Sequence, residues 1–484
     1  MAGRDLDLVE KLNEDERAIR RRRLRAVSPD DGKYAEDAND LRLFLSPEAE
    51  WLACARFQLS LLEARKEFGQ AKQRHVDEVF AALENIDPLN MALLEEKVTR
   101  HDQLAVIEEI GRFVSPETKA LLHPGTTSYD ILDTVRSHLF GKAWDKVMQP
   151  RVNGVLTQLC DIAEETLDVV QVGRTHLQYT SPVLFGGMIA GYAARIAERA
   201  QFLGKSYGNL RGKVSGIVGT GASIEMVVGK GRALEFEKAA LAKLGLEPDP
   251  TATQIVQKER LVDVGHGLVT LAHVLGNFAG DMRMLYSQDV QEVTSREAAD
   301  RLGGSSADAS KNNPINWENI QGKAVVVESG MRVLYAMMLT DFQRDLRGSV
   351  QARYQPQGMM TEVHEMFGRA SKELRQLSLN RDKVAEHLQT VRDFPSEAMV
   401  AILRGEGYVH PTSGEGHEFV KVVSRRAKGK GKSLLDEALT DIHFKEVYDR
   451  LPEQKQRILR GELELYLGHS LERARQNIAF ARSY

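Results

Sequence analysis

One polar loop, residues 304–319, carries residue types that suit acid–base chemistry and anion binding. Ser305 and Ser306 offer a nucleophile or a base. Lys311 and Asn313 supply a positive charge and an amide donor for an anion. The leading glycine lets the backbone approach a ligand closely, but the composition fits a solvated connection between two helices equally well. The loop is therefore a candidate site whose role depends on the rest of the chain.

Three further polar clusters stand at the ends of segments with periodic apolar residues. They are Arg100–Asp102, His123–Thr134 and Gly173–Gln178. A single histidine near a helix end is more often structural than catalytic, but several such clusters together favour a shared site. In the second cluster, Thr127-Ser128 and Asp130 also fit the cap of a helix that starts near Tyr129. Such a helix N-terminus can itself bind an anion.

Long helices must position these clusters. Proline is absent from residues 183–247 and 251–313, which favours uninterrupted helices. In the second stretch, apolar residues recur at alternating steps of three and four, as in a helix packed lengthwise on others. These residues are Leu261, Val264, Leu268, Leu271, Leu275, Phe278, Met282 and Leu285. Gly276 and Gly280 lie four residues apart on one face, where they would permit close contact between helices.

We predict an all-α fold with three helical subdomains. The central one, residues 123–365, is a bundle of long helices. It follows an N-terminal helical domain, residues 1–122, and precedes a C-terminal helical domain, residues 366–484. Turn-forming residues mark the first boundary, and the glycine-rich segment 405–416 reads as a loop within the C-terminal domain.

The composition is typical of a globular protein that spans no membrane. Hydrophobic residues make up 42% of the chain and charged residues 28%. No apolar run approaches the roughly 18 residues that a membrane span needs. The first residues lack the apolar core of a secretory signal, and Cys54 and Cys160 give neither a disulfide framework nor metal-ligand spacing. We therefore expect a cytoplasmic protein.

The charge pattern argues against nucleic-acid binding. The net charge is −4, which does not suit a general polyanion binder. Residues 20–25 and 425–432 are strongly basic, but neither run contains the interleaved aromatic residues that stack on bases. We expect both runs to be solvated arms or mobile loops.

In order along the chain, the polar clusters resemble the motifs of the fumarase/aspartase superfamily of fumarate-releasing lyases, and within it the adenylosuccinate lyase family. The resemblance covers nearly the whole chain. Besides the clusters already described, it includes Ser28–Tyr34, which is similar to Ser-Pro-x-Asp-Gly-Arg-Tyr, and the pair Thr253-Gln254. Residues 343–353 resemble Arg-Asp-Leu-x-x-Ser-x-x-x-Arg, the pattern that holds a nucleotide phosphate. That pattern separates this family from its amino-acid-lyase relatives.

The resemblance implies a β-elimination that cleaves adenylosuccinate to AMP and fumarate, and a related succinyl-carboxamide purine intermediate in the same way. Such a reaction needs a base for a carbon-bound proton, stabilisation of a carbanion, and an acid for the departing nitrogen. By resemblance, Ser305 is the base, His176 is the acid and Glu318 orients His176. An isolated serine is too weak a base, so backbone N–H groups and Lys311 would have to lower its pKa.

The resemblance also implies how the substrate, a succinylated purine nucleotide, is held. Thr127, Ser128, Lys311 and Asn313 would hold the succinyl carboxylates, and arginine forks would give bidentate contacts to the phosphate. His123 would support the site. The implied substrate-binding residues are Lys33, Tyr34, Arg100, His101, Asp102, Thr127, Ser128, Thr175, Gln254, Lys311, Asn313, Asn319, Arg344, Ser349 and Arg353. The family uses no metal or organic cofactor, and its homotetramers build each active site from three subunits.

The chain departs from the family pattern in the polar loop. The family reads Gly-Ser-Ser-x-Met-Pro-x-Lys-x-Asn-Pro, and here Asp308 and Ala309 replace Met and Pro. A carboxylate about 4 Å from a substrate carboxylate would cost on the order of 1 to 4 kcal/mol. Loss of the proline also loosens a loop that must close over a substrate. Either Asp308 points outward, or the substrate differs, or activity is impaired; we favour the first two because Ser305, Lys311 and His176 remain.

Several alternatives stay open at this point. Arg344-Asp345 also fits an exposed ion pair within a helix, and Lys33-Tyr34 fits a surface turn. Gly216–Gly221 hints at a phosphate loop but lacks the Gly-Lys-Ser/Thr ending. A lyase of the same fold that acts on another succinyl adduct is the nearest rival function. A non-catalytic scaffold that binds partners through its basic arms is a rival of a different class.

Overall fold

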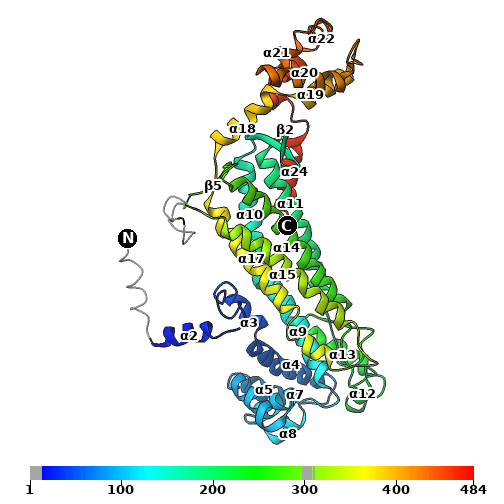
Figure 1. Cartoon of the computed structure of the whole chain (residues 1–484). Helices are drawn as coiled ribbons and strands as arrows, with labels where there is room; N and C mark the ends of the chain where they lie inside the picture. Colours follow the sequence, from blue (N-terminus) through cyan, green and yellow to red (C-terminus); the bar gives the residue numbers. More distant parts are fainter. Residues whose placement is uncertain (1–13, 297–307, 309–310) are drawn as a thin grey trace. The chain divides into compact units, whose positions relative to one another are not determined.

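The computed structural model describes residues 14–296, 308 and 311–484. Over these residues the chain consists of α-helices accompanied by four pairs of short strands, which confirms the predicted all-α fold (Figure 1). The chain divides into two compact units. The first unit comprises residues 1–152, 199–273 and 322–368, and the second comprises residues 153–198, 274–321 and 369–484. The three predicted subdomains stay a prediction.

In the first unit, several short and medium helices pack around one apolar core. Its elements are α2 (Glu14–Leu24), η1 (Asn39–Leu41), α3 (Arg42–Leu45), α4 (Pro47–Glu67), α5 (Gln73–Ala82), α6 (Pro88–Leu94), η2 (Glu95–Thr99), α7 (Asp102–Gly111), α8 (Pro116–Ala120), α9 (Ser128–Ala143), η3 (Trp144–Met148), β3 (Arg211–Gly212), α12 (Ala222–Val228), α13 (Ala233–Ala242), β4 (Glu247–Pro248) and α16 (Arg347–Gln351). Helix α4 starts at Pro47, because the Ser46 hydroxyl accepts a hydrogen bond from the Ala49 backbone N–H and proline fits the first turn of a helix. Its buried face, which includes Phe57 and Leu61, packs into the core with α5, α7, α9 and α13.

The second unit contains the remaining sheets and the C-terminal helices. Its elements are β1 (Val170–Thr175), β2 (Gln178–Leu184), β5 (Val293–Ser295), β6 (Leu377–Leu379), α18 (Arg381–Asp393), α19 (Ser396–Gly405), β7 (Val409–His410), β8 (Gly414–Glu415), α20 (Gly416–Lys430), α21 (Leu434–Ala438), α22 (Ile442–Tyr448), α23 (Glu453–Leu459), η5 (Leu463–Leu465) and α24 (Ser470–Arg482). The segment 405–416, predicted as a loop, contains the small antiparallel pair β7–β8. Helices α19 to α23 share a core around Phe419 and Phe444.

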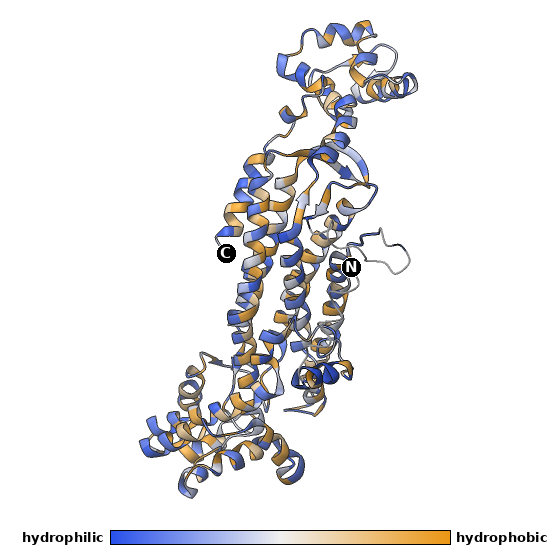
Figure 2. Ribbon diagram, turned by 90° about the vertical axis from the view of Figure 1, so that its left-hand side faces the viewer, coloured by the Kyte–Doolittle hydropathy of each residue, from blue (hydrophilic) through white to orange (hydrophobic). Residues whose placement is uncertain are grey.

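Five long helices contribute residues to both units. They are α10 (Gln149–Glu165), α11 (Phe185–Gly208), α14 (Glu259–Tyr286), α15 (Ile315–Met337) and α17 (Gln357–Gln376). Helix α14 lies where the sequence predicts a long helix, and seam residues such as Leu268 and Leu275 are fully buried. Gly280 permits close packing, because a Cβ there would stand 2.8 Å from Nε2 of Gln321. Figure 2 shows hydrophobic and hydrophilic residues alternating along the helices, as in amphipathic helices packed on a core.

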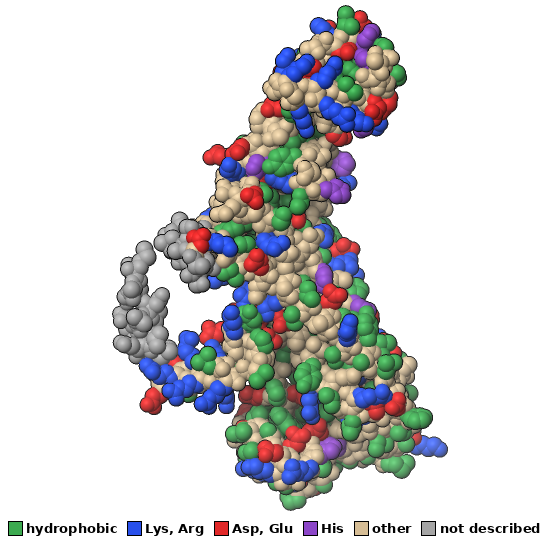
Figure 3. Space-filling view, viewed as in Figure 1, with side chains coloured by type: hydrophobic (Ala, Val, Ile, Leu, Met, Phe, Trp, Pro, Cys, Tyr) green, Lys and Arg blue, Asp and Glu red, His purple; other side chains and the backbone are tan. Residues whose placement is uncertain are grey.

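The two basic runs are helical. Residues 20–24 belong to α2, which has no buried residue, and Figure 3 shows lysine and arginine side chains gathered over it. This agrees with a solvated arm. Residues 425–430 form the last turns of α20, which ends at Gly431 in the left-handed conformation. The expectation of an arm or mobile loop is therefore wrong for the second run, because amphipathic spacing that buries Val423 and Ala427 continues the helix through the charges. Among the described residues, no helix is both long and apolar enough to cross a membrane.

Candidate active site

The N-terminus of α9 is built around a buried carboxylate in the first unit. Thr127 is the N-cap, and its backbone N–H donates to Asp130 Oδ2 at 2.7 Å in a capping box. The predicted helix cap is thus confirmed, and it leaves the half-buried Thr127 and Ser128 at the positive end of a helix, where a carboxylate can bind.

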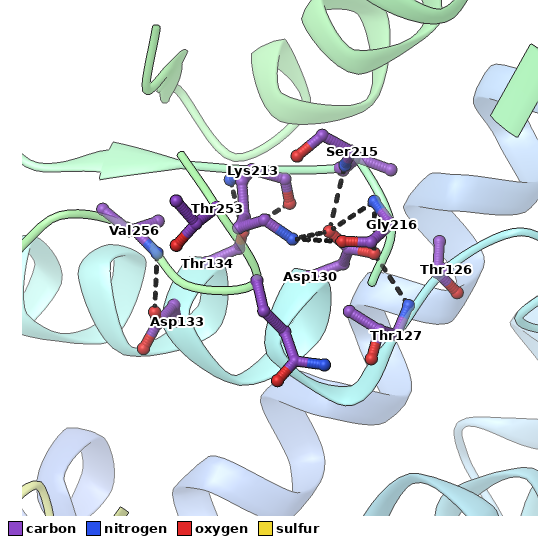
Figure 4. A network of polar contacts seen from close by, with 12 residues as sticks. Thr126, Thr127, Asp130, Asp133, Thr134, Lys213, Ser215, Gly216, Thr253 and Val256 are labelled. Atoms are coloured by element: carbon purple, nitrogen blue, oxygen red, sulfur yellow. Dashed lines mark hydrogen bonds and ion pairs between the residues drawn. The ribbon is translucent and has the colours of Figure 1, made fainter. Parts of the chain in front are cut away.

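Asp130 also holds a second segment of chain against this helix end. It accepts backbone N–H groups of Ser215 at 3.0 Å and Gly216 at 3.1 Å, and it pairs with the fully buried Lys213 ammonium. Lys213 in turn donates to the Gly216 carbonyl at 3.2 Å. Figure 4 shows these contacts converging on Asp130. Residues 213–216 therefore anchor the α9 N-terminus.

Three of the predicted ligand residues contact one another in the first unit, where the guanidinium of one binds the other two. Arg344 donates to Gln254 Oε1 and to Ser349 Oγ, each at 3.1 Å. Its Cζ lies 3.7 Å from the centre of the Tyr129 ring, and the Tyr129 hydroxyl hydrogen-bonds Ser349. This aromatic partner was missed in the sequence analysis, although it lies within the second polar cluster.

The simple explanation of Arg344-Asp345 as an ion pair within a helix is wrong. Residues 341–346 are not helical, and Asp345 pairs with Arg347 at 2.7 Å. That guanidinium and two backbone N–H groups hold the pKa of Asp345 well below its usual range. Among the described residues no carboxylate pairs with Arg344, so its positive charge is available to an anionic ligand.

The cluster Arg100–Asp102 interacts electrostatically with His123 and Glu95. His101 Nδ1 is 3.4 Å from Asp102. Burial raises the pKa of Glu95, and the nearby Asp102 adds to this while Arg353 and His101 oppose it. Burial, with Arg65 and His101, lowers the pKa of His123 to about 4, so this ring is neutral at physiological pH. His123 therefore suits a hydrogen-bonding role, in line with its predicted supporting function.

Arg65 is a structural residue that the sequence analysis missed. This residue is 1% exposed, and its guanidinium donates to the carbonyls of Leu121 and Pro124, the latter at 2.7 Å. These contacts fix the turn that carries His123 in the left-handed conformation, with φ of 65°. Sequence offers no signal for this, because the partners lie 56 and 59 residues away.

Lys33 and Tyr34 lie in consecutive turns that follow Ser28. Lys33 is exposed, and its ammonium is 5.9 Å from the Tyr34 ring. Three residues at the beginning of the motif, Ser28, Asp30 and Asp31, line a cavity of about 440 Å³ together with Arg353. Lys33 and Tyr34 thus have the turn geometry of the alternative explanation, a surface turn. The start of the same segment lines a cavity with Arg353, a predicted phosphate-binding residue.

One group of acidic residues in the described chain has the spacing of a cation site. Asp30, Glu362 and Glu365 offer oxygens within 4.8 Å of one another. The Lys323 ammonium already lies among them, 2.7 Å from Glu365. Burial raises the pKa of Asp30, and burial raises that of Glu365 to about 7. Lysine and protons thus compensate the charge of this group.

In the second unit, His176 lies at the tip of the β1–β2 hairpin. Thr175 pairs with Gln178, so His176 and Leu177 form a two-residue turn, with φ of 54° and 61°. Both central residues of such a turn need positive φ, which asparagine and glycine adopt far more easily than leucine. The His176 side chain is exposed. Backbone strain of this kind gathers at functional sites, and Arg100 and His123 share it.

The polar loop is only partly described. Ser305, the predicted base, and Ala309 lie outside the described residues. Asp308 is exposed, and its carbonyl accepts the Lys311 backbone N–H at 3.2 Å. Lys311 is exposed and Asn313 is half-buried.

Helix α15 begins at Ile315, so residues 315–319 of the segment predicted as a polar loop are helical, and they include two further predicted residues. Glu318 is exposed and Asn319 is half-buried in its first turns. Trp317, in the first turn of α15, is 2% exposed and packs edge-on against Phe278 at 5.6 Å between ring centres. This aromatic contact anchors the start of the helix.

The comparisons with known proteins identify the family. A family model described as lyase matches residues 40–329. The chain belongs to this lyase family. Adenylosuccinate lyase of Archaeoglobus fulgidus is 28% identical over 92% of this chain and 97% of that protein. The Bacillus subtilis adenylosuccinate lyase is 31% identical over 65% of this chain and 68% of its own length. A third relative, from Synechocystis, is 31% identical, and the match spans 65% of its length.

Solved structures support the same fold. The 3-carboxy-cis,cis-muconate lactonizing enzyme from Pseudomonas putida matches with a TM-score of 0.78 and 21% identity, over 92% of this chain and 97% of that one. A fumarate lyase from Mesorhizobium matches with a TM-score of 0.77 and 21% identity, over 91% and 97%. At this identity the similarity establishes the fold alone.

Proposed function

We propose that this lyase eliminates fumarate from adenylosuccinate to release AMP, and from the succinyl-carboxamide purine intermediate to release its carboxamide. Relatives bearing the name adenylosuccinate lyase match up to 92% of the chain and support this substrate class. A phosphorylated purine is a cytoplasmic metabolite, so we place the activity in the cytoplasm. The proposal needs no metal or organic cofactor.

The observation that carries the proposal is the setting of Arg344. Its guanidinium stacks on Tyr129 and binds a neutral amide and a neutral hydroxyl, with no carboxylate partner among the described residues. A half-buried arginine without a counter-charge favours an anionic ligand, and its fork suits a phosphate. A nucleotide substrate supplies that phosphate, whereas an amino-acid adduct does not. Lys33, Tyr34, Ser349 and Arg353 complete the proposed phosphate site.

In the proposed mechanism, Ser305 takes the proton from the carbon next to the succinyl carboxylate. The electron pair left behind forms the carbon–carbon double bond as the carbon–nitrogen bond breaks, and the departing nitrogen takes a proton from His176. The α9 N-terminus at Thr127-Ser128, with Lys311 and Asn313, stabilises the developing negative charge on the succinyl carboxylates. Glu318 orients His176.

We assign the further substrate contacts to six other polar residues, supported by one histidine. They are Arg100, His101, Asp102, Thr175, Gln254 and Asn319, with His123 in support.

A homotetramer with composite active sites is part of the proposal. The segment from Val325 to Tyr354 exposes many large apolar side chains. Phe342 is 93% exposed, and Leu339 and Leu346 are each 71% exposed. Such a density of exposed apolar side chains favours burial between subunits. Light scattering after size exclusion should give four times the mass of the chain, and a monomer that is fully active would contradict this part.

The phosphate assignment is tested by comparing two substrates that differ only in the phosphate. We expect Arg344→Ala to lower kcat/KM for adenylosuccinate by roughly 100- to 1000-fold, because two charge-assisted hydrogen bonds are lost. The same variant should change kcat/KM for succinyladenosine, which lacks the phosphate, by less than about threefold. Fumarate release is followed by ultraviolet absorbance.

Arg347→Ala is the matched control. It removes a neighbouring arginine that already pairs with Asp341 at 3.0 Å and Asp345 at 2.7 Å, so neither substrate should be affected strongly. Equal losses on both substrates in Arg344→Ala would contradict the phosphate assignment. Activity confined to another succinyl adduct would favour the rival lyase, and no activity on any adduct would favour a scaffold.

A further inference from the structure

A buried charged cluster lies directly below the hairpin turn that carries His176. Arg174 in β1 donates to both oxygens of Glu292, at 2.5 and 3.0 Å. Glu292 has a fully buried side chain and also accepts from His387 Nδ1 at 2.6 Å. We propose that Glu292 and His387 are positioning residues. They act through Arg174 to fix His176 in the position from which it transfers its proton. This inference rests on the proposed role of His176 as the acid.

The charged cluster contacts both strands of the hairpin next to the turn. Arg174 pairs with Tyr179 in the strand register, so the two residues lie opposite each other one pair below the turn. The Arg174 guanidinium stands 5.1 Å from the centre of the Tyr179 ring, and that ring stands 5.7 Å from the His387 ring. A single cluster thus contacts the strand that enters the turn and the strand that leaves it.

The strained backbone of the turn explains why contacts to both strands are needed. His176 and Leu177 adopt a backbone conformation that their side chains disfavour, and this persists only where the surroundings over-determine it. A bidentate pair between a buried carboxylate and an arginine supplies two directional contacts at one point of the strand. The turn itself has an exposed histidine and an exposed leucine, so its position depends on the strands below it.

The hydrogen-bond pattern assigns His387 a definite role. Glu292 can only accept, so the Nδ1 of His387 carries the hydrogen and donates to Oε1. Arg174 Nη2 lies 3.5 Å from that same nitrogen, but two donors do not bond each other, so Oε1 is the shared acceptor. His387 therefore orients the Glu292 carboxylate, and Glu292 orients Arg174. The Asn380 N–H donates to the Glu292 carbonyl at 2.8 Å and ties the backbone at the same place.

The test separates positioning from simple structural support. We expect Glu292→Gln to lower kcat for adenylosuccinate about 10- to 100-fold while KM changes less than threefold, because misplacing a proton donor by about 1 Å acts on the chemical step. In a His176→Gln background, the same change should lower kcat no further, because the proton donor it positions is already gone. The exposed pair Arg381–Asp168 supplies the control: Arg381 lies on α18, the helix that carries His387, and Arg381→Ala should leave kcat unchanged.

His387 gives a second, milder route. His387→Asn keeps a donor N–H near Glu292 and should retain kcat within about threefold, whereas His387→Leu removes the donor and should lose about tenfold. This pair remains informative if Glu292→Gln does not fold.

The outcomes are distinct. Losses from Glu292→Gln that multiply fully with those from His176→Gln, or equal losses in both His387 variants, would overturn the positioning role alone. If His176→Gln retains wild-type kcat, the acid assignment fails, and the positioning role fails with it.

Discussion

Replacement of Lys213 by methionine would leave the Asp130 carboxylate buried without its ammonium partner. Both side chains have no exposure, and removal of one member of such a buried pair costs about 3 to 5 kcal/mol. Three backbone N–H groups still donate to Asp130, which favours the lower end of that range. Methionine fills the space of the lysine stem, so no large cavity adds to the cost. We expect the free energy of unfolding to fall by about 3 kcal/mol.

The measurement is urea unfolding at a fixed protein concentration, with a matched lysine as control. Lys243 pairs with Glu67 at 2.7 Å, but both side chains are partly exposed, so Lys243→Met should cost less than about 1 kcal/mol. Adding Asp130→Asn to Lys213→Met should restore part of the loss, because the buried charge is then removed. KM for adenylosuccinate should rise in Lys213→Met, since the anchor of the α9 N-terminus is loosened. A loss below about 1 kcal/mol for Lys213→Met would refute the reasoning.

Three further predictions concern His123, Glu365 and the adjacent pair Asp308 and Ala309. Burial lowers the pKa of His123 from 6.5 to about 4, so its stabilising contribution is complete above pH 6.5 and is lost as the pH falls through 4. His123→Gln should remove about 3 kcal/mol of the acid destabilisation measured between these pH values. Burial raises the pKa of Glu365 to about 7, so its contribution is complete below pH 4.5 and is lost as the pH rises through 7. Thermal unfolding of Glu365→Gln should therefore depend less on pH between 5 and 8, and an unchanged slope would contradict this. Asp308→Met with Ala309→Pro should leave kcat and KM for adenylosuccinate within about twofold, whereas a large gain in kcat/KM would place Asp308 against the substrate.

The fold was predictable where the signal was local. The alternating three- and four-residue spacing that predicts the helix through Leu268 and Leu275 depends on neighbours along the chain, and α14 follows it. The β1–β2 hairpin, in which Gln171 to Thr175 precede a two-residue turn, was not predicted from the sequence. Its turn residues, His176 and Leu177, lack the asparagine or glycine that normally indicates such a turn.

The site was predictable only in part for the same reason. The cap formed by Thr127 and Asp130 follows from a three-residue spacing. Lys213, which neutralises the same Asp130, lies 83 residues away, and no pattern within the chain indicates the pairing. Glu292 and Arg174 are separated by 118 residues. Long-range ion pairs of this kind depend on the packing of the whole unit, so the structure was needed to find them.

The strained turn at the hairpin tip also has a consequence for protein engineering. Leucine in the left-handed conformation costs about 1 to 2 kcal/mol, and asparagine at Leu177 would recover most of this. Replacement of the exposed Leu177, next to His176, by asparagine should therefore raise thermal stability. Whether turnover survives that gain would tell an engineer how much of the strain the enzyme uses.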